Sequence, residues 1–207
     1  MFIKICGLTR VEDALAAVDN GANAIGYILA RSQRQISLEL LESISSHVPA
    51  SVKQVGVFVN PERQKVEEVL ERVNLDFLQF HGQETGAYCR SFGCDYIKAI
   101  AVSDAFSIAE VAAEHPTAHA FLLDTYDKQM AGGSGRSFNW SHWPAQSDKP
   151  LILAGGLTPD NVAGAIAKVS PYGVDVSGGV EAANGGQKGI KDPELIRRFI
   201  QQVRSCS

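Results

Sequence analysis

The sequence has no excess of basic residues and no long apolar run. Its 207 residues carry 19 lysines and arginines against 23 acidic residues, which gives a net charge of −4. Without a basic surplus to neutralise phosphates, a nucleic-acid partner is not expected. No stretch approaches the roughly 18 apolar residues that a membrane helix needs, so we expect no membrane partner and a cytoplasmic location.

Paired cysteine motifs are absent as well. The four cysteines, Cys6, Cys89, Cys94 and Cys206, form no CxxC pair and have no histidine at the spacing of a metal ligand. This pattern argues against a disulfide framework and against a zinc site. We therefore expect reduced thiols, no metal and no cofactor.

What the sequence does contain is a regular series of short apolar segments separated by helical patterns. With 45% hydrophobic residues, the chain can bury the core of one globular domain. The segments expected to be strands are residues 2–6, 24–29, 52–59, 75–80, 96–102, 120–124, 151–154 and 173–177. Eight strand-then-helix units predict an α/β protein that forms a single (β/α)₈ barrel domain over residues 1–207.

An open, doubly wound sheet is the alternative architecture. Such a sheet usually has fewer strands and a glycine-rich nucleotide fingerprint after the first of them. Here the segment CGLTR stands in place of a GxGxxG fingerprint, which favours the barrel. The sixth helix is expected to be short or irregular, because only residues 138–143 are available for it after the long, glycine-rich loop 125–139.

Polar residues before several helical patterns indicate where the helices start. Thr9, with a glutamate three residues later, has the form of a capping box. Ser37, Asn60 and Asp192 are expected N-cap residues, and the last two precede a proline at the first helical position. Thr158, also followed by proline, is expected to open a further helix.

In a (β/α)₈ barrel the residues just after each strand share one face, where ligands bind. Two adjacent strands end in glycine pairs, Gly155-Gly156 and Gly178-Gly179, and Ser177 precedes the second pair. Backbone amides exposed by glycine at a helix N-terminus form an anion site, so these residues predict a phosphate-binding site. The alternative is that the glycines only form turns.

Cys6 and Asp124 are the strand-end groups best suited to proton transfer. A thiolate can remove a proton from carbon and a carboxylic acid can give one to oxygen, so together they can move a proton within one substrate molecule. In a chain without a nucleotide or metal motif, this pair points to an isomerase that needs no cofactor. The alternative is that Cys6 is a small buried hydrophobic residue and that Asp124 is a helix cap or an ion-pair partner.

Arginine and histidine side chains also follow predicted strands. Arg34 has the two-point geometry that binds a carboxylate, although arginines are more often solvated at the surface and Arg31 is an equally placed alternative. His81 has no adjacent acidic residue, so a hydrogen-bonded structural histidine is favoured over a general base.

Several longer motifs match one enzyme family in the same order. They are KICGLTR at 4–10, SxR at 32–34, FHG at 80–82, LLDT at 122–125, LAGGLTPDNV at 153–162, GVDVS at 173–177, GVE at 179–181 and KD at 191–192. Over nearly its whole length the chain therefore resembles the phosphoribosylanthranilate isomerase family of tryptophan biosynthesis.

The resemblance implies a fold, a reaction and roles for individual residues. It implies a (β/α)₈ barrel that performs the Amadori rearrangement of N-(5-phosphoribosyl)anthranilate, a small phosphorylated substrate, with Cys6 as general base and Asp124 as general acid. Arg34 falls on the family's arginine for the anthranilate carboxylate. The other residues expected to bind substrate are Gly155, Gly156, Asp175, Ser177, Gly178 and Gly179.

The chain departs from the family pattern in a few places. Gly178 stands where a second serine is usual, which puts one side-chain contact to the phosphate in question while the backbone amide remains. In the long loop, GSG at 133–135 and FNW at 138–140 stand where GTG and FDW are usual. The sequence leaves the oligomeric state open.

Two other functions are compatible with this fold. A sugar-phosphate isomerase or synthase would use paired carboxylates or a lysine base, and the cysteine at position 6 argues against the paired carboxylates. A catalytically silent barrel that binds a phosphorylated metabolite would carry the same glycine pairs. Turnover of phosphoribosylanthranilate without added metal or nucleotide distinguishes the three.

Overall fold

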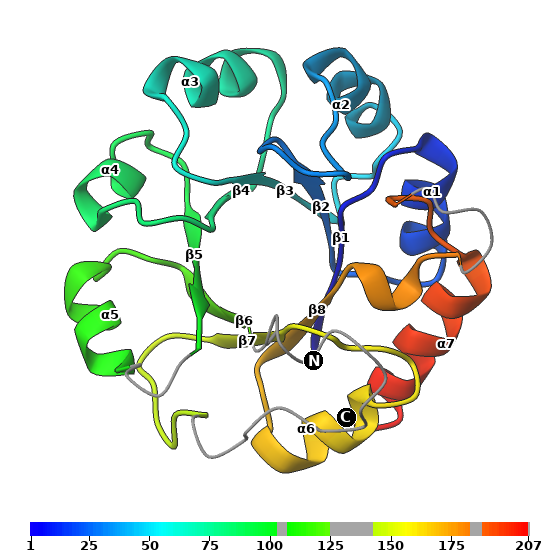
Figure 1. Ribbon diagram of the computed structural model, residues 1–207. Helices are drawn as coiled ribbons and strands as arrows, with labels where there is room; N and C mark the ends of the chain where they lie inside the picture. Colours follow the sequence, from blue (N-terminus) through cyan, green and yellow to red (C-terminus); the bar gives the residue numbers. More distant parts are fainter. Residues whose placement is uncertain (103–106, 125–142, 183–187, 207) are drawn as a thin grey trace.

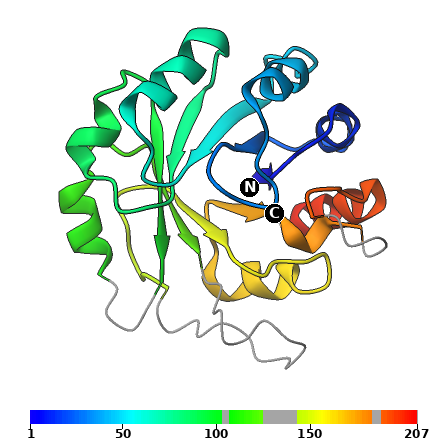
Figure 2. The ribbon, with the colours of Figure 1, turned by 45° about the horizontal axis from the view of Figure 1, so that its top comes forward.

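Eight parallel strands close into a barrel in the computed structural model of the chain (Figure 1). The structure describes residues 1–102, 107–124, 143–182 and 188–206. Helices surround the strands, as is visible both along the barrel and in the tilted view (Figures 1 and 2). The (β/α)₈ barrel expected from the sequence is therefore confirmed.

All eight apolar segments identified in the sequence are strands. They are β1 (Phe2–Cys6), β2 (Ala24–Ile28), β3 (Lys53–Phe58), β4 (Phe77–Phe80), β5 (Tyr96–Ala101), β6 (Ala120–Asp124), β7 (Leu151–Ala154) and β8 (Gly173–Val176). Each strand pairs in parallel with the next, and β8 closes the barrel on β1, where Lys4 lies opposite Asp175. The carboxyl ends of the strands therefore meet at one end of the barrel.

Helices follow most of the strands. They are α1 (Val11–Asp19), α2 (Leu38–Ser45), α3 (Arg63–Arg72), α4 (Gly86–Arg90), α5 (Ile108–Glu114), α6 (Val162–Val169) and α7 (Pro193–Arg204), with a short 3₁₀ helix η3 (Gly178–Val180) after β8. The expected short helix at 138–143 and the loop 125–139 fall almost entirely outside the described residues. Over the ranges given above, no helix is both long and apolar enough to cross a membrane. The extent of the domain, residues 1–207, stays a prediction.

Side chains alternate between the barrel interior and the helix layer, because successive residues of a strand point to opposite faces. Aliphatic side chains, half of them alanine, fill part of the interior; this cluster consists of Ala24, Val55, Ile97, Ala99, Ala120, Leu122, Ile152 and Ala154. A larger cluster between strands and helices includes Ile3 and Ile5. On β1 the same alternation directs Lys4 and Cys6 into the barrel.

Two of the N-caps predicted from the sequence are confirmed. The side-chain oxygen of Ser37 accepts a hydrogen bond from the backbone amide of Leu40 at the start of α2. Asp192 accepts from the amides of Glu194 and Leu195 at the start of α7, with proline at the first helical position. These caps satisfy amides that have no partner within the helix.

The capping box expected at Thr9 and the N-cap expected at Asn60 are wrong. The Thr9 hydroxyl donates instead to the carbonyl oxygen of Gly189, at 2.9 Å. Asn60 adopts a left-handed φ of 44°, and its Oδ1 accepts from the amide of Gln83 at 2.7 Å. Both side chains therefore join distant loops beyond the carboxyl ends of the strands, and α1 and α3 begin further along the chain.

Candidate functional site

A cavity of about 690 Å³ opens at the carboxyl ends of the strands. It is lined by residues from the ends of every strand except β5 and from the loops that follow β2, β4, β7 and β8. All the residues predicted for the site line this one cavity: Cys6, Arg34, Asp124, Gly155, Gly156, Asp175, Ser177, Gly178 and Gly179. The fold thus brings together residues that are far apart in the sequence.

Cys6 is the last residue of β1 and is 5% exposed. It lies opposite Gly26 of β2, and a Cβ atom at Gly26 would come within 2.7 Å of the Cys6 sulfur and 3.2 Å of the Lys4 Cε. The glycine therefore leaves the space that these two neighbouring side chains occupy. Lys4 is two residues earlier on the same strand, so it points to the same side.

Lys4 and Asp175 form a buried ion pair beside Cys6. The Lys4 Nζ donates to Asp175 Oδ1 at 2.7 Å, and the lysine side chain, which has no solvent exposure, lies beside that of Cys6. Burial raises the pKa of the Cys6 thiol above its ordinary value, although the nearby Lys4 charge acts in the opposite direction. The sequence showed Lys4 only as a polar interruption of an apolar strand, so this role was missed.

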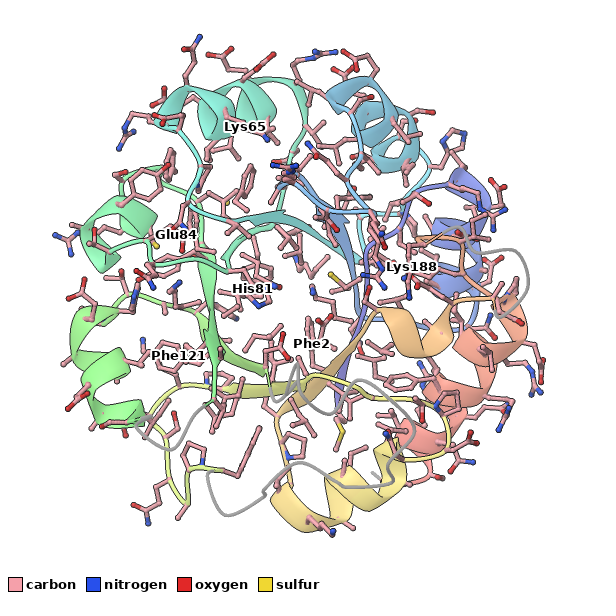
Figure 3. The ribbon with its side chains drawn as sticks, viewed as in Figure 1. Phe2, Lys65, His81, Glu84, Phe121 and Lys188 are labelled. Carbon is pink, nitrogen blue, oxygen red and sulfur yellow. The ribbon has the colours of Figure 1, made fainter. Side chains whose placement is uncertain are left out.

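Asp124 ends β6 and faces His81, which follows β4 and points toward the barrel centre (Figure 3). The His81 Nε2 lies 3.5 Å from Asp124 Oδ2, and the His81 Nδ1 lies 3.3 Å from the Gln79 Nε2. Within the described part of the chain, the buried Oε1 of Gln79 has no hydrogen-bond partner. His81 has no acidic neighbour along the sequence, but the fold places the carboxylate of Asp124 beside it.

The guanidinium of Arg34 is held by Glu181. Arg34 Nε and Nη2 donate to the two carboxylate oxygens at 2.5 and 3.0 Å, and the Lys191 Nζ lies 3.3 Å from Glu181 Oε1. Burial would raise the pKa of Glu181, but the Arg34 hydrogen bonds and the Lys191 charge lower it to about 2. Arg31, the alternative arginine, is exposed. Glu181 and Lys191 were recognised within motifs but without a role.

The two glycine pairs line the same side of the cavity. Gly155 and Gly156 have φ angles of 94° and 62°, a left-handed backbone that glycine adopts without strain. No described atom lies within 4 Å of a Cβ position at Gly156, so this glycine faces open space. A Cβ at Gly179 would meet the carbonyl oxygen of Leu157, so the loops after β7 and β8 are in contact.

The helix expected to begin at Thr158 begins later. The N-cap of α6 is Asn161, and Thr158 belongs to a turn in which its Oγ1 accepts from the amide of Asp160. The Gly155-Gly156 amides therefore do not lie at the first turn of a helix, and that part of the argument for an anion site is wrong. Lys188, which the sequence gave no reason to select, is an exposed cation that lines the cavity (Figure 3).

Sequence comparison finds one enzyme family. The family model described as N-(5'-phosphoribosyl)anthranilate (PRA) isomerase matches residues 3–202. An N-(5'-phosphoribosyl)anthranilate isomerase of Pseudomonas fluorescens is 52% identical over 202 residues, which cover 97% of each chain. The enzyme of the same name from Azotobacter vinelandii is 49% identical over 204 residues, covering 98% of this chain and 97% of that one.

Solved structures give the same result. The crystal structure of phosphoribosyl anthranilate isomerase from Thermotoga maritima superposes with a TM-score of 0.88 at 40% identity, covering 99% of each chain. A crystal structure of the isomerase in complex with reduced 1-(o-carboxyphenylamino)-1-deoxyribulose 5-phosphate gives a TM-score of 0.84 at 37% identity, again over 99% of each chain.

Replacement of Glu181 by glutamine should lower the free energy of unfolding by about 3–5 kcal/mol at neutral pH, because Arg34 and Lys191 lose their shared carboxylate. A carboxylate with a lowered pKa stabilises the folded state above its ordinary value of 4.5, and that stabilisation is lost as the pH falls toward about 2. The difference between wild type and Glu181→Gln should therefore shrink over this acidic range. Urea unfolding at several pH values measures it.

Glu194→Gln is the matched control for this experiment. Glu194 pairs with Arg197 on the surface of α7, where ion pairs contribute little to stability. A loss for Glu181→Gln no larger than that of the control, or a loss that does not change with pH, would contradict the account of this cluster.

Proposed function

The chain belongs to the family of N-(5'-phosphoribosyl)anthranilate isomerases, the aldose–ketose isomerases of tryptophan biosynthesis, and we propose that Cys6 and Asp124 carry out its two proton transfers. The reaction is the Amadori rearrangement of N-(5-phosphoribosyl)anthranilate to 1-(2-carboxyphenylamino)-1-deoxyribulose 5-phosphate. The observation that supports the assignment best is that a thiol from β1 and a carboxyl group from β6 line the same cavity.

Asp124 is the general acid in this proposal. It gives a proton to the ring oxygen of the ribose, so that the C1–O bond breaks and a Schiff base forms between C1 and the anthranilate nitrogen. His81, whose Nε2 is 3.5 Å from the Asp124 carboxylate, fixes the direction of that carboxyl group and can return a proton to it. General acids of this kind must lie within hydrogen-bond reach of the leaving oxygen.

Cys6 is the general base. As a thiolate it removes the proton from C2 of the Schiff base, and the electron pair moves to form the C1–C2 double bond of an enolamine. The enolamine then becomes the ketone as its C2 hydroxyl loses a proton and C1 gains one. Oxidation at C2 is matched by reduction at C1, so the reaction requires no external oxidant or reductant. The cycle closes when Cys6 gives its proton back to solvent and Asp124 regains one.

The remaining residues of the cavity bind the two anionic ends of the substrate. We assign the phosphate to the loops that carry Gly155-Gly156 and Ser177 to Gly179, which contact each other beyond β7 and β8. The anthranilate carboxylate is assigned to Arg34, with Asp175 as a partner for a sugar hydroxyl. Arg34 Nε and Nη2 face Glu181, which orients the planar group and leaves Nη1 for the substrate.

The substrate of this chain and its cellular location stay predictions. The relative solved with a reduced phosphorylated product supports a small phosphorylated substrate for this chain. The cytoplasmic location expected from the sequence is part of the same proposal.

Cys6→Ser and Asp124→Asn should each lower kcat by about 10² to 10⁴ while KM changes little, because each removes a proton-transfer group rather than a binding contact. The assay follows loss of the fluorescence of phosphoribosylanthranilate without added metal or nucleotide. Cys89→Ser is the control, since Cys89 is buried in the helix layer. Near-normal kcat in Cys6→Ala would exclude the thiol as the base and make His81 the next candidate.

Arg34→Ala should raise KM, and Arg34→Lys should restore binding only in part, because lysine lacks the planar fork that matches a carboxylate. Steady-state kinetics over a range of substrate concentrations measures both. Arg31→Ala serves as the control at the exposed arginine of the same loop. An increase in KM for Arg31→Ala equal to that for Arg34→Ala would show that the carboxylate was assigned to the wrong arginine.

Gly156→Asp should raise KM much more than Gly156→Asn. Both side chains tolerate a left-handed backbone better than other residues and enter the open space beside Gly156, but only aspartate repels a phosphate. The difference in KM between the two variants isolates the charge from the change in shape. Equal KM values would mean that the phosphate binds elsewhere in the cavity.

A further inference from the structure

Cys6, the proposed general base, must lose its proton before it can act. A free thiol is mostly protonated at neutral pH, and burial raises the pKa of Cys6 further. One conceivable source of help is the positive end of α1, the next helix along the chain. However, Asp13 in the first turn of that helix is buried and already pairs with Arg10, and it accepts a hydrogen bond from the amide of Lys191. The positive end of α1 is therefore already compensated by the carboxylate of Asp13 and is not available to the Cys6 thiolate.

Charged and titratable groups approach Cys6 from several elements. Those on the near side are Lys4 of β1, Asp175 of β8, Arg34 after β2 and Lys191 before α7, and those across the cavity are Asp124 of β6 and His81 after β4. The charges of Arg34 and Lys191 are both directed at Glu181. Burial also lowers the pKa of Lys191. Both cations act on Cys6 through space, but the ion-pair partner of each is Glu181.

Lys4 differs from these two cations in its contacts. Its ammonium group donates to Asp175, and a Cβ at Gly26 would lie within 2.7 Å of the Cys6 sulfur and 3.2 Å of the Lys4 Cε, so the lysine stem and the sulfur lie side by side. Burial acts to lower the pKa of Lys4, but Asp175 and Cys6 together hold it above its ordinary value. The lysine therefore places its ammonium group beside the sulfur.

We propose that Lys4 is a positioning residue for the proton transfer at C2: clamped by Asp175, its ammonium holds the Cys6 sulfur in place and stabilises the thiolate. Cys6 loses its proton to water before substrate binds, and Lys4 keeps its own protons throughout the cycle. Asp175 fixes the direction of the ammonium and keeps it charged. This inference rests on the proposed role of Cys6 as the base.

Lys4→Gln tests the proposal, because glutamine keeps a hydrogen-bond donor for Asp175 but removes the charge. The first readout is the midpoint of the acid limb of kcat/KM against pH, which should move upward by about one pH unit, a tenfold loss below the midpoint. The second readout is the pH dependence of Cys6 alkylation by iodoacetamide, followed by mass spectrometry of the Cys6 peptide. The midpoint of the alkylation profile should move upward by the same amount as that of kcat/KM.

Lys98→Gln is the matched control. Lys98 is also a buried strand lysine with a carboxylate partner, Glu84 at 2.9 Å, but it belongs to β5 and its ammonium also bonds the carbonyl oxygens of Phe80 and Gly82. Its loss should lower stability without moving either midpoint. If Lys4→Gln only scales activity down at every pH, or if its alkylation midpoint equals that of wild type, the proposal is wrong.

The alkylation experiment requires no turnover, so it separates this inference from the proposed function. If Cys6→Ser retains normal kcat, the assignment of the base fails whatever Lys4 does. If Cys6→Ser is inactive and the alkylation midpoint of Lys4→Gln is unchanged, the base is correct and the role of Lys4 is wrong. Should Lys4→Gln fail to fold, Gly26→Ala, which would displace the sulfur and the lysine stem, gives the same pH readouts.

Discussion

The buried pair of Lys4 and Asp175 lies where the barrel closes. The two residues are register partners on β1 and β8, the first and last strands, and their charges meet at 2.7 Å in the barrel interior. Removing one partner of such a pair leaves an uncompensated buried charge, which is strongly destabilising. The alignment of β1 with β8 thus determines where the Lys4 ammonium lies, and that position is beside the Cys6 side chain.

A second charged cluster fixes the rim of the cavity. Arg34 after β2, Glu181 after η3 and Lys191 before α7 meet through the carboxylate of Glu181. This cluster ties the loop after β2 to two points of the connection between β8 and α7, and the Lys191 ammonium also bonds the carbonyl oxygen of Ser177. The connection after β8 is therefore held by ion pairs as well as by the packing of Val180 in the hydrophobic core. In this cluster two cations share the single carboxylate of Glu181, and this excess of positive charge suits a substrate with a phosphate and a carboxylate.

The sequence predicted all the strands because short apolar segments are a local pattern, and it selected Cys6 and Asp124 because strand ends of a barrel share one face. It could not place Thr9 or Asn60, since both side chains bind loops that are distant along the chain. The contacts of Lys4 could not be predicted for the same reason. In the sequence it only interrupts an apolar strand, because its ion-pair partner, Asp175, lies on β8. An ion pair between residues that are far apart in the chain leaves no pattern in the local sequence from which it could be predicted.

The central claim is that the Cys6 thiolate removes the proton from C2 of the substrate. Single-turnover reaction of substrate deuterated at C2 tests it most directly, with the release of deuterium to water followed separately from ring opening. The account predicts a primary isotope effect in the wild type and no release of label by Cys6→Ala, even while Asp124 still opens the ring. Release of label by Cys6→Ala at a rate close to that of the wild type would contradict it.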